Sequence, residues 1–138
     1  MTDWNERNRQ VIEHIRANGG VSPSGSRPAL LTTTGARSGK SHTVPLAVMQ
    51  DDDRIIVFGS VMGGPRNPDW YFNIKANPNV TVEYGGQTFA TRAHIAEGEE
   101  RARLWAKAVA TMPIVVQHQE KTTRQIPIVI LPRPTSSG

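Results

Sequence analysis

The chain has 138 residues, of which 37% are hydrophobic and 20% are charged, and its formal net charge is +4. These values are typical of one folded domain with a core, and they exclude a disordered chain. The absence of cysteine excludes disulfides, thiolate catalysis and most zinc sites, and no apolar run approaches the roughly 20 residues that span a bilayer. The excess of basic residues favours an anionic partner: a small acidic ligand, a nucleic acid or a membrane surface.

The first predicted element is an amphipathic helix over residues 3–18, which Gly19 and Gly20 end. We expect its apolar stripe to pack against the rest of the protein, and contact between Trp4 and a membrane surface is the alternative. The chain is therefore divided into three parts, which are a helix over 1–20, a single domain over 28–133 and a flexible tail over 134–138.

Six β-strands are predicted after a loop, because β-branched and aromatic residues gather in short runs between turn signals. They cover residues 29–33, 43–50, 54–59, 80–84, 88–96 and 126–131. The three aspartates at 51–53 and the pair Gly85–Gly86 predict hairpins. Antiparallel strands without alternating helices favour a small barrel or sandwich over a doubly wound sheet.

Two further helices are expected between the strands. Asn67 as a cap followed by Pro68 predicts a short helix that ends before Pro78. A longer helix is predicted from about 99 to 112, and its apolar face would consist of Ala102, Trp105, Val109 and Met112.

Residues 30–46 place a glycine-bounded basic turn between two strands, and such a turn offers N–H groups, hydroxyls and cations to an anion. Gly39, Lys40 and Ser41 match the end of a P-loop, but that motif needs a glycine where this chain has Thr34. It also needs a helix directly afterwards, whereas the sequence that follows is β-branched and broken by proline. We therefore predict an anion site that is not a P-loop.

A second cluster spans residues 58–70, where a strand ends in small residues and a glycine pair precedes a helix. Small residues let a flat ligand approach the backbone, and free N–H groups bind ring carbonyls; a tight structural loop is the alternative. Two such loops in one small domain favour a ligand with a charged tail and a ring. The four histidines show neither metal spacing nor a hydrolase triad, so we expect no metal site.

Three co-linear motifs resemble the deazaflavin-dependent nitroreductase family of actinobacteria. They are 30–46, 56–79 with its core Asn67-Pro68-x-Trp70-Tyr71-x-Asn73, and Arg124-x-Ile126-Pro127-Ile128-Val129-Ile130. The resemblance implies a mainly β, α+β fold: a split β-barrel like those of flavin reductases and pyridoxamine-phosphate oxidases, with peripheral helices. It also implies coenzyme F(420), a 5-deazaflavin with a phosphate and an oligoglutamate tail, which is the kind of anion that the basic turn suits.

The reduced deazaflavin is an obligate hydride donor, and the protein mainly orients the ring and polarises the acceptor. The resemblance therefore implies hydride transfer to an electron-poor acceptor, namely a quinone, an activated conjugated carbonyl or a nitro compound. Ser60 is the catalytic candidate, because its hydroxyl could polarise a carbonyl or nitro oxygen.

The resemblance also assigns binding residues by position. The phosphate and tail would contact Ala36, Arg37, Ser38, Lys40 and His42, the last standing where the family often has arginine. The cofactor would be lined by Thr43, Val44, Pro45, Leu46 and Ala47, and its ring by Phe58, Gly59, Ser60 and Val61. The short helix would close the site with Asp69, Trp70, Tyr71 and Asn73.

The substrate wall would consist of Met62, Val115 and His118. Family members that reduce nitroimidazole prodrugs carry tyrosines in this region, whereas residues 112–119 of this chain contain none. Nitroimidazole turnover is therefore not implied, and quinones or conjugated carbonyls are the expected acceptors.

Two alternatives belong to other classes: a split-barrel oxidoreductase that binds FMN, and a non-catalytic protein with a basic binding surface. The basic residues are spread over several segments without a nucleic-acid motif, so we expect no nucleic-acid partner. The expected location is the cytoplasm, with the N-terminal helix as an alternative contact to the inner face of the membrane. The oligomeric state stays open.

Overall fold

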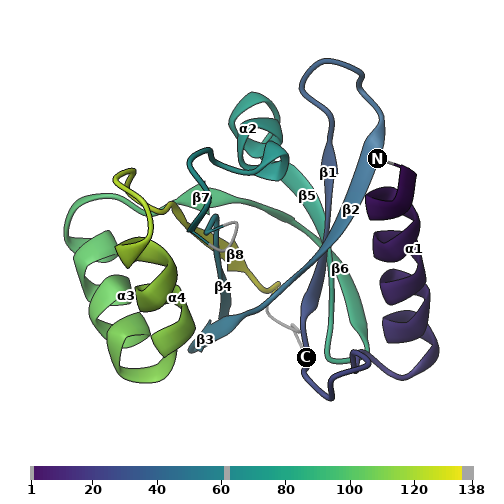
Figure 1. Cartoon of the computed structure of the whole chain (residues 1–138), viewed down its shortest axis with the longest axis horizontal. Coiled ribbons are helices and arrows are strands. Elements are labelled where there is room, and N and C mark those ends of the chain that lie inside the picture. Colours follow the sequence, from purple (N-terminus) through teal and green to yellow (C-terminus); the bar gives the residue numbers. More distant parts are fainter. Residues whose placement is uncertain (1, 61–62, 135–138) are drawn as a thin grey trace.

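The computed structural model describes residues 2–60 and 63–134, and its centre consists of two four-stranded antiparallel sheets (Figure 1). The first sheet has the order β2-β1-β5-β6, from Ser41–Leu46, Ala29–Thr34, Asn79–Tyr84 and Gln87–Arg92. The second has the order β3-β4-β8-β7, from Met49–Asp51, Arg54–Phe58, Ile128–Pro132 and His94–Ile95. The predicted mainly β architecture is confirmed.

Two of the predicted strands are each divided in two. The run 43–50 becomes the end of β2 and β3, and the run 88–96 becomes β6 and β7. At each break the chain leaves one sheet and pairs in the other, because β2 pairs with β1 whereas β3 pairs with β4. Both predicted hairpins are confirmed, and Asp52 accepts a positive φ of +54° in the β3–β4 turn.

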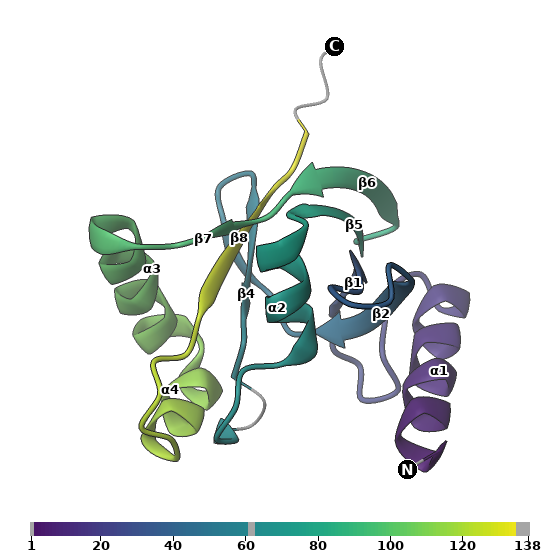
Figure 2. The ribbon, with the colours of Figure 1, turned by 90° about the horizontal axis from the view of Figure 1, so that it is seen from above.

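The barrel interior forms where one face of each sheet meets the other. Leu31 and Val82 of the first sheet pack with Val57 and Leu131 of the second, and all four side chains are 0% exposed. The helix α2, Asp69–Ala76, lies beside the sheets and adds Trp70 and Ile74 to this core (Figure 2). Burial of this much apolar surface is the main stabilising contribution to the barrel.

The helix α1, Thr2–Ala17, lies on the other face of the first sheet (Figures 1 and 2). Ile12 and Ile15 are buried against Leu30, whose neighbour Leu31 points into the barrel, as alternation along a strand requires. Arg16 donates two hydrogen bonds, of 2.9 and 2.7 Å, to the carboxylate of Glu83. The helix is thus where the sequence predicts it, and the described part of its apolar stripe packs on the sheet.

The helices α3, Gly98–Thr111, and α4, Pro113–Glu120, cover the outer face of the second sheet. The predicted apolar face of α3 is wrong in part: Leu104 and Ala108 are buried, whereas Val109 is 52% exposed. The sheet contacts α3 along the row of Leu104 and Ala108, which are spaced i, i+4. The sequence alone does not distinguish this row from the similar apolar row that was predicted. The sequence analysis also missed α4, which Pro113 begins at a position suited to proline.

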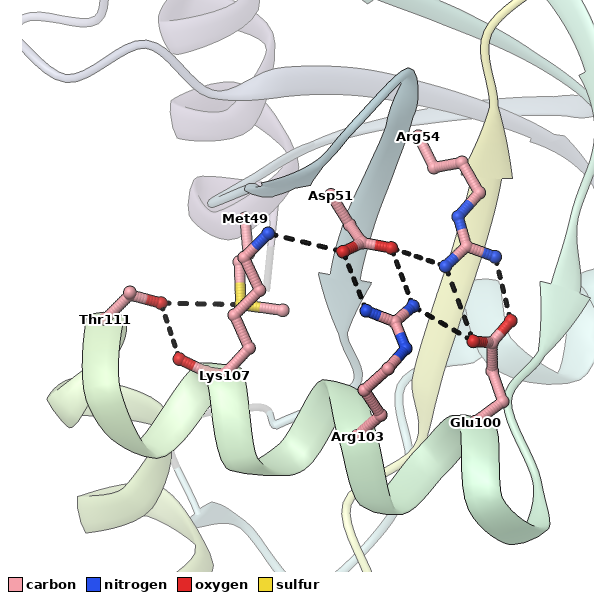
Figure 3. A network of polar contacts seen from close by, with 7 residues as sticks. All are labelled: Met49, Asp51, Arg54, Glu100, Arg103, Lys107 and Thr111. Carbon is pink, nitrogen blue, oxygen red and sulfur yellow. Dashed lines mark hydrogen bonds and ion pairs between the residues drawn. The ribbon is translucent and has the colours of Figure 1, made fainter.

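An ion network joins the β3–β4 hairpin to α3 (Figure 3). Asp51 is only 4% exposed and accepts hydrogen bonds from Arg54, from Arg103 at 3.0 and 2.8 Å, and from Lys107 at 3.3 Å. Glu100 accepts from Arg54 at 2.8 Å and from Arg103 at 3.0 Å. Hydrogen bonds from Arg103 and then Arg54 hold the pKa of the Asp51 carboxyl well below its usual range.

The predicted cap of α2 is also wrong. The helix is capped by Pro68 without a side-chain hydrogen bond, because the Oδ1 atom of Asn67 accepts from Arg124 instead. The predicted flexible tail lies, apart from residue 134, outside the described residues. No helix in the described part of the chain is long and apolar enough to cross a membrane.

Candidate functional site

The basic turn joins β1 to β2 at the tip of a hairpin, and its own hydrogen bonds hold it closed. Gly35 N–H donates to the Lys40 carbonyl at 2.7 Å, Gly39 N–H to the Gly35 carbonyl at 3.0 Å, and Lys40 N–H to Ser38 Oγ at 3.1 Å. A Cβ at Gly35 would lie 2.6 Å from Ser38 Oγ and 2.9 Å from His42 Nε2. A side chain at position 35 would collide with Ser38 or His42, so the closed turn requires glycine there.

The closed turn keeps groups free for an anion. The side chains of Arg37 and Lys40 are exposed and form no ion pair with any described residue. In the same part of the chain, the N–H groups of Arg37 and Ser38 have no acceptor, whereas those of Gly35, Ala36, Gly39 and Lys40 do. Two cationic side chains and two N–H groups of one closed turn are thus without a partner among the described residues, and such a set of donors suits an anion.

Asn73 of α2 fixes this turn to the barrel. Its Oδ1 accepts the Ala36 N–H at 3.0 Å, and its Nδ2 donates to Thr33 Oγ1 at 3.0 Å. Asn73 is only 8% exposed and both ends of its amide are engaged. Its influence on a ligand therefore acts through the position of the turn.

The strand β2 divides the predicted lining residues between two faces. Val44 and Leu46 pack against the barrel core, on the same side as His42. Thr43 and Pro45 alternate to the opposite face, where Thr43 Oγ1 lies 2.7 Å from Thr32 Oγ1. Ala47 follows the end of the strand and is exposed. His42, Val44 and Leu46 are thus the members of this set that share a face.

The segment after β4 is held by a residue to which the sequence analysis gave no role. Arg124 donates to the carbonyls of Gly59 at 2.9 Å, Ser60 at 2.8 Å and Gly64 at 2.9 Å, and to Asn67 Oδ1 at 2.6 Å. The loop that carries Arg124 is fixed in turn by Gln119, which donates to the Arg124 carbonyl at 2.7 Å. A conspicuous arginine in the third motif was the available signal for this role.

Gly59 itself has a packing explanation. A Cβ at this position would lie 3.2 Å from Pro127 Cγ and 3.2 Å from Pro68 Cδ. Phe58 is likewise buried, in the core between the second sheet and the helices α3 and α4. Gly59 and Phe58 thus both have packing roles in this segment.

Ser60 meets His118 of the substrate wall. Ser60 Oγ lies 3.1 Å from His118 Nδ1, although the two residues are 58 positions apart. Burial, and then the positive charge of Lys121, lower the pKa of His118. The structure thus brings together Ser60, the predicted catalytic residue, and His118 of the predicted substrate wall. Val61 and Met62 lie outside the described residues.

Other predicted site residues take different positions. The side chain of Trp70 belongs to the barrel core and is 6% exposed, so it packs there instead of closing a ligand site. Val115 is buried against α3 and the second sheet. Asp69 is exposed at the start of α2. The centroid of the Tyr71 ring lies 5.4 Å from Lys75 Nζ.

A cleft of about 830 Å³ lies on the side of α2 that faces α3, and the basic turn does not line it. Its walls include Tyr71, Arg101, Trp105 and Arg124. Tyr71 is the one predicted binding residue that lines this cleft, so the cleft next to α3 and the basic turn are separate features. Within the described residues, no three His, Asp or Glu side chains gather as metal ligands.

Two antiparallel sheets closed into a barrel, with a basic turn and a hydroxyl–imidazole pair beside them, place this chain in the split-barrel fold class. The comparisons with known proteins narrow this class. A family model described as F420H(2)-dependent quinone reductase matches residues 6–133. The chain belongs to this family, and the family's cofactor is coenzyme F(420).

Individual relatives agree with the family match. An F420H(2)-dependent quinone reductase of Mycobacterium tuberculosis is 35% identical over 113 residues, which are 79% of this chain and 76% of the relative. The structure of an F420-H2 dependent reductase, FDR-A, is 42% identical with a TM-score of 0.68, and the match covers 75% of this chain and 92% of that one. Another solved structure, described as a domain-swapped dimer, is 39% identical with a TM-score of 0.71, covering 94% and 98%.

Proposed function

We propose that this chain reduces quinones with a hydride from F(420)H2, and that activated conjugated carbonyls and nitro compounds are further candidate acceptors. Membership of the family supports the reaction class. The observation that carries the assignment of the binding site is the basic turn, in which the side chains of Arg37 and Lys40 are exposed and form no ion pair with any described residue. The phosphate and glutamate carboxylates of the cofactor are anions that this donor set fits.

Different residues of the chain bind the cofactor and polarise the acceptor. The turn binds the phosphate and tail, and Asn73 keeps the turn at a fixed place on the barrel. When bound, the reduced deazaflavin supplies the hydride. Arg124 holds the backbone of Ser60, whose hydroxyl donates a hydrogen bond to the acceptor oxygen as negative charge develops there.

The binding site is tested by titrating the purified protein with oxidised F(420) and following the fluorescence of the coenzyme. We expect binding at or below tens of micromolar, and Arg37→Ala should weaken it about 3- to 10-fold, as expected for an exposed charge contact. Added salt should weaken binding of the native protein by screening. Arg27→Ala is the matched control, because it removes the same charge at the opposite end of β1. Equal affinities of the two variants would contradict the assigned site.

The reaction is tested with a panel of acceptors and reduced F(420): a naphthoquinone, a cyclohexenone and a nitroimidazole. We expect turnover of the quinone and none of the nitroimidazole, since residues 112–119 contain no tyrosine. A protein that binds F(420) but leaves every quinone unreduced would contradict the proposal. A yellow protein with flavin absorbance would favour the FMN-binding alternative.

A further inference from the structure

The contact between Ser60 and His118 is set by the close fit of two backbone segments. The carbonyl of Ser60 is held by Arg124 at 2.8 Å, so the start of the segment cannot swing away from α4. Three residues later, a Cβ at Gly63 would lie 2.8 Å from the His118 carbonyl oxygen and 2.7 Å from Lys121 Cβ. Gly63 therefore lies directly against the end of α4, as Ser60 does through the 3.1 Å contact between its Oγ and His118 Nδ1.

Reduction of a quinone to a hydroquinone needs one hydride and one further proton. A serine hydroxyl can pass on a proton only if a second group replaces it, and histidine is the side chain that titrates near neutral pH. We propose that His118 supplies the second proton of the reaction through Ser60, an inference that rests on the quinone reduction proposed above. In this role His118 is a positioning residue, because the group that touches the acceptor is Ser60.

The proposed proton transfer assigns a donor to each hydrogen bond. Nδ1–H of the His118 imidazolium donates to Ser60 Oγ, and the Ser60 O–H donates to the acceptor oxygen. The acceptor gains two electrons and one proton as the hydride from F(420)H2, takes the Ser60 proton at its oxygen, and becomes the hydroquinone. Ser60 takes the Nδ1 proton, and the neutral imidazole later takes a proton from solvent, which the partly exposed side chain allows.

The charged groups around His118 determine the pH range of this step. Lys121 lies on the next turn and opposes protonation, and Arg124 directs its Nη2 to the Ser60 carbonyl. The facing segment, residues 59–65, contains no titratable side chain. Since burial and Lys121 both lower the pKa of His118, the acid form accumulates only below the ordinary value of about 6.5. The kcat should therefore rise as the pH falls through this lowered pKa.

The first test needs no cofactor. The four histidines are titrated by two-dimensional NMR in the native protein and in Ser60→Ala, and His118→Gln identifies the resonance by its loss. An imidazolium that donates to Ser60 Oγ is stabilised in its charged form, so Ser60→Ala should lower the pKa of His118 further, by about half a unit. A pKa that is raised or unchanged would overturn the proposal, because Ser60 would then be donating to a neutral imidazole or making no hydrogen bond.

The second test compares pH profiles of quinone reduction. Above the pKa of His118, kcat of the native enzyme should fall about tenfold per pH unit. His118→Gln should lower kcat about 100-fold at pH 6 and leave KM little changed. The kcat of this variant should no longer depend on pH in this range. His94→Gln is the matched control, because His94 is exposed on β7. Native-like kcat and pH dependence in His118→Gln would disprove the role of His118. A native protein that reduces no quinone at any pH would instead disprove the proposed function, while the NMR result stands independently.

Discussion

The guanidinium of Arg124 gives hydrogen bonds to four acceptors that no strand or helix pairs. Three are backbone carbonyls, of Gly59, Ser60 and Gly64, and the fourth is the side chain of Asn67. Burial lowers the pKa of Arg124, but a guanidinium stays charged near neutral pH, so these are charge-assisted hydrogen bonds. A single side chain therefore joins Gly59, Ser60, Gly64 and Asn67, and the Gly63 N–H also donates to the Ser60 carbonyl at 2.8 Å.

We expect Arg124→Ala to lower the free energy of unfolding by about 2–3 kcal/mol, because it leaves several partly buried acceptors without a donor. Arg124→Lys should recover only a small part, since an ammonium cannot reproduce the planar arrangement of donors. Urea unfolding measures both variants. Arg66→Ala serves as the control, because Arg66 is exposed on the same segment. An unfolding midpoint of Arg124→Ala equal to that of the control would show that the guanidinium does not stabilise the segment.

At the scale of elements, the Asp51 network connects a hairpin to a helix on the second sheet (Figure 3). Asp51 is the buried member, whereas Arg103 and Lys107 reach it from the exposed side of α3. Its pKa is depressed in the folded protein, so the stability that it contributes is present above the pKa of about 4 in the unfolded chain. This contribution is lost as the pH falls from about 4 towards the folded pKa.

Asp51→Asn should therefore lower the free energy of unfolding by roughly 2–4 kcal/mol at pH 7, because three cations lose their buried counter-ion. The native protein and the variant should converge as the pH falls below about 4. Unfolding by urea between pH 7 and pH 2.5 measures this difference. Asp53→Asn, an exposed change in the same turn, should follow the native curve. A difference between Asp51→Asn and the native protein that does not change with pH would contradict the assignment.

The elements were predictable where local chemistry decides them. Runs of β-branched residues located the strands, and Gly85–Gly86 fixed a hairpin, because these signals act within a few residues. The breaks at 47–48 and at 93 were not predictable, since they depend on which sheet each half pairs with. The buried face of α3 depends in the same way on the sheet beneath it.

The candidate site was likewise predictable only where its residues are close together in the sequence. The turn at 35–40 could be recognised because glycines and cations are adjacent in the sequence. The pairing of Ser60 with His118 and the contacts of Arg124 join segments about 60 residues apart, so no local pattern contains them. The sequence also could not show that Asn73 and Trp70 face the turn and the core respectively.

At the scale of the whole molecule, the first sheet has two faces with different tasks. Its outer face packs against α1 through Ile15 and Leu30, and its inner face closes the barrel. The basic turn projects from the end of the same sheet and contributes no residue to either core (Figure 1). Stability and binding should therefore respond to different substitutions.

Ile15→Ala should lower the free energy of unfolding by about 2–4 kcal/mol, because it leaves a cavity at a side chain that is 2% exposed. Arg16→Ala should cost less than about 1 kcal/mol, since the pair with Glu83 is largely exposed. Urea unfolding gives both values, and F(420) titration of the folded proteins should give unchanged affinities. A clear loss of affinity in Ile15→Ala would show that α1 and the turn are coupled.

The amide of Asn73 has a consequence for protein engineering. It anchors the turn by the backbone N–H of Ala36, not by the side chains of Arg37, Ser38 and Lys40. The side chains of Arg37 and Lys40 can therefore be exchanged without disturbing the anchor, whereas Ser38 Oγ accepts the Lys40 N–H and helps to close the turn. Variants at Arg37 and Lys40 alone should therefore keep the barrel folded, so the charge of the turn can be adjusted independently of the fold.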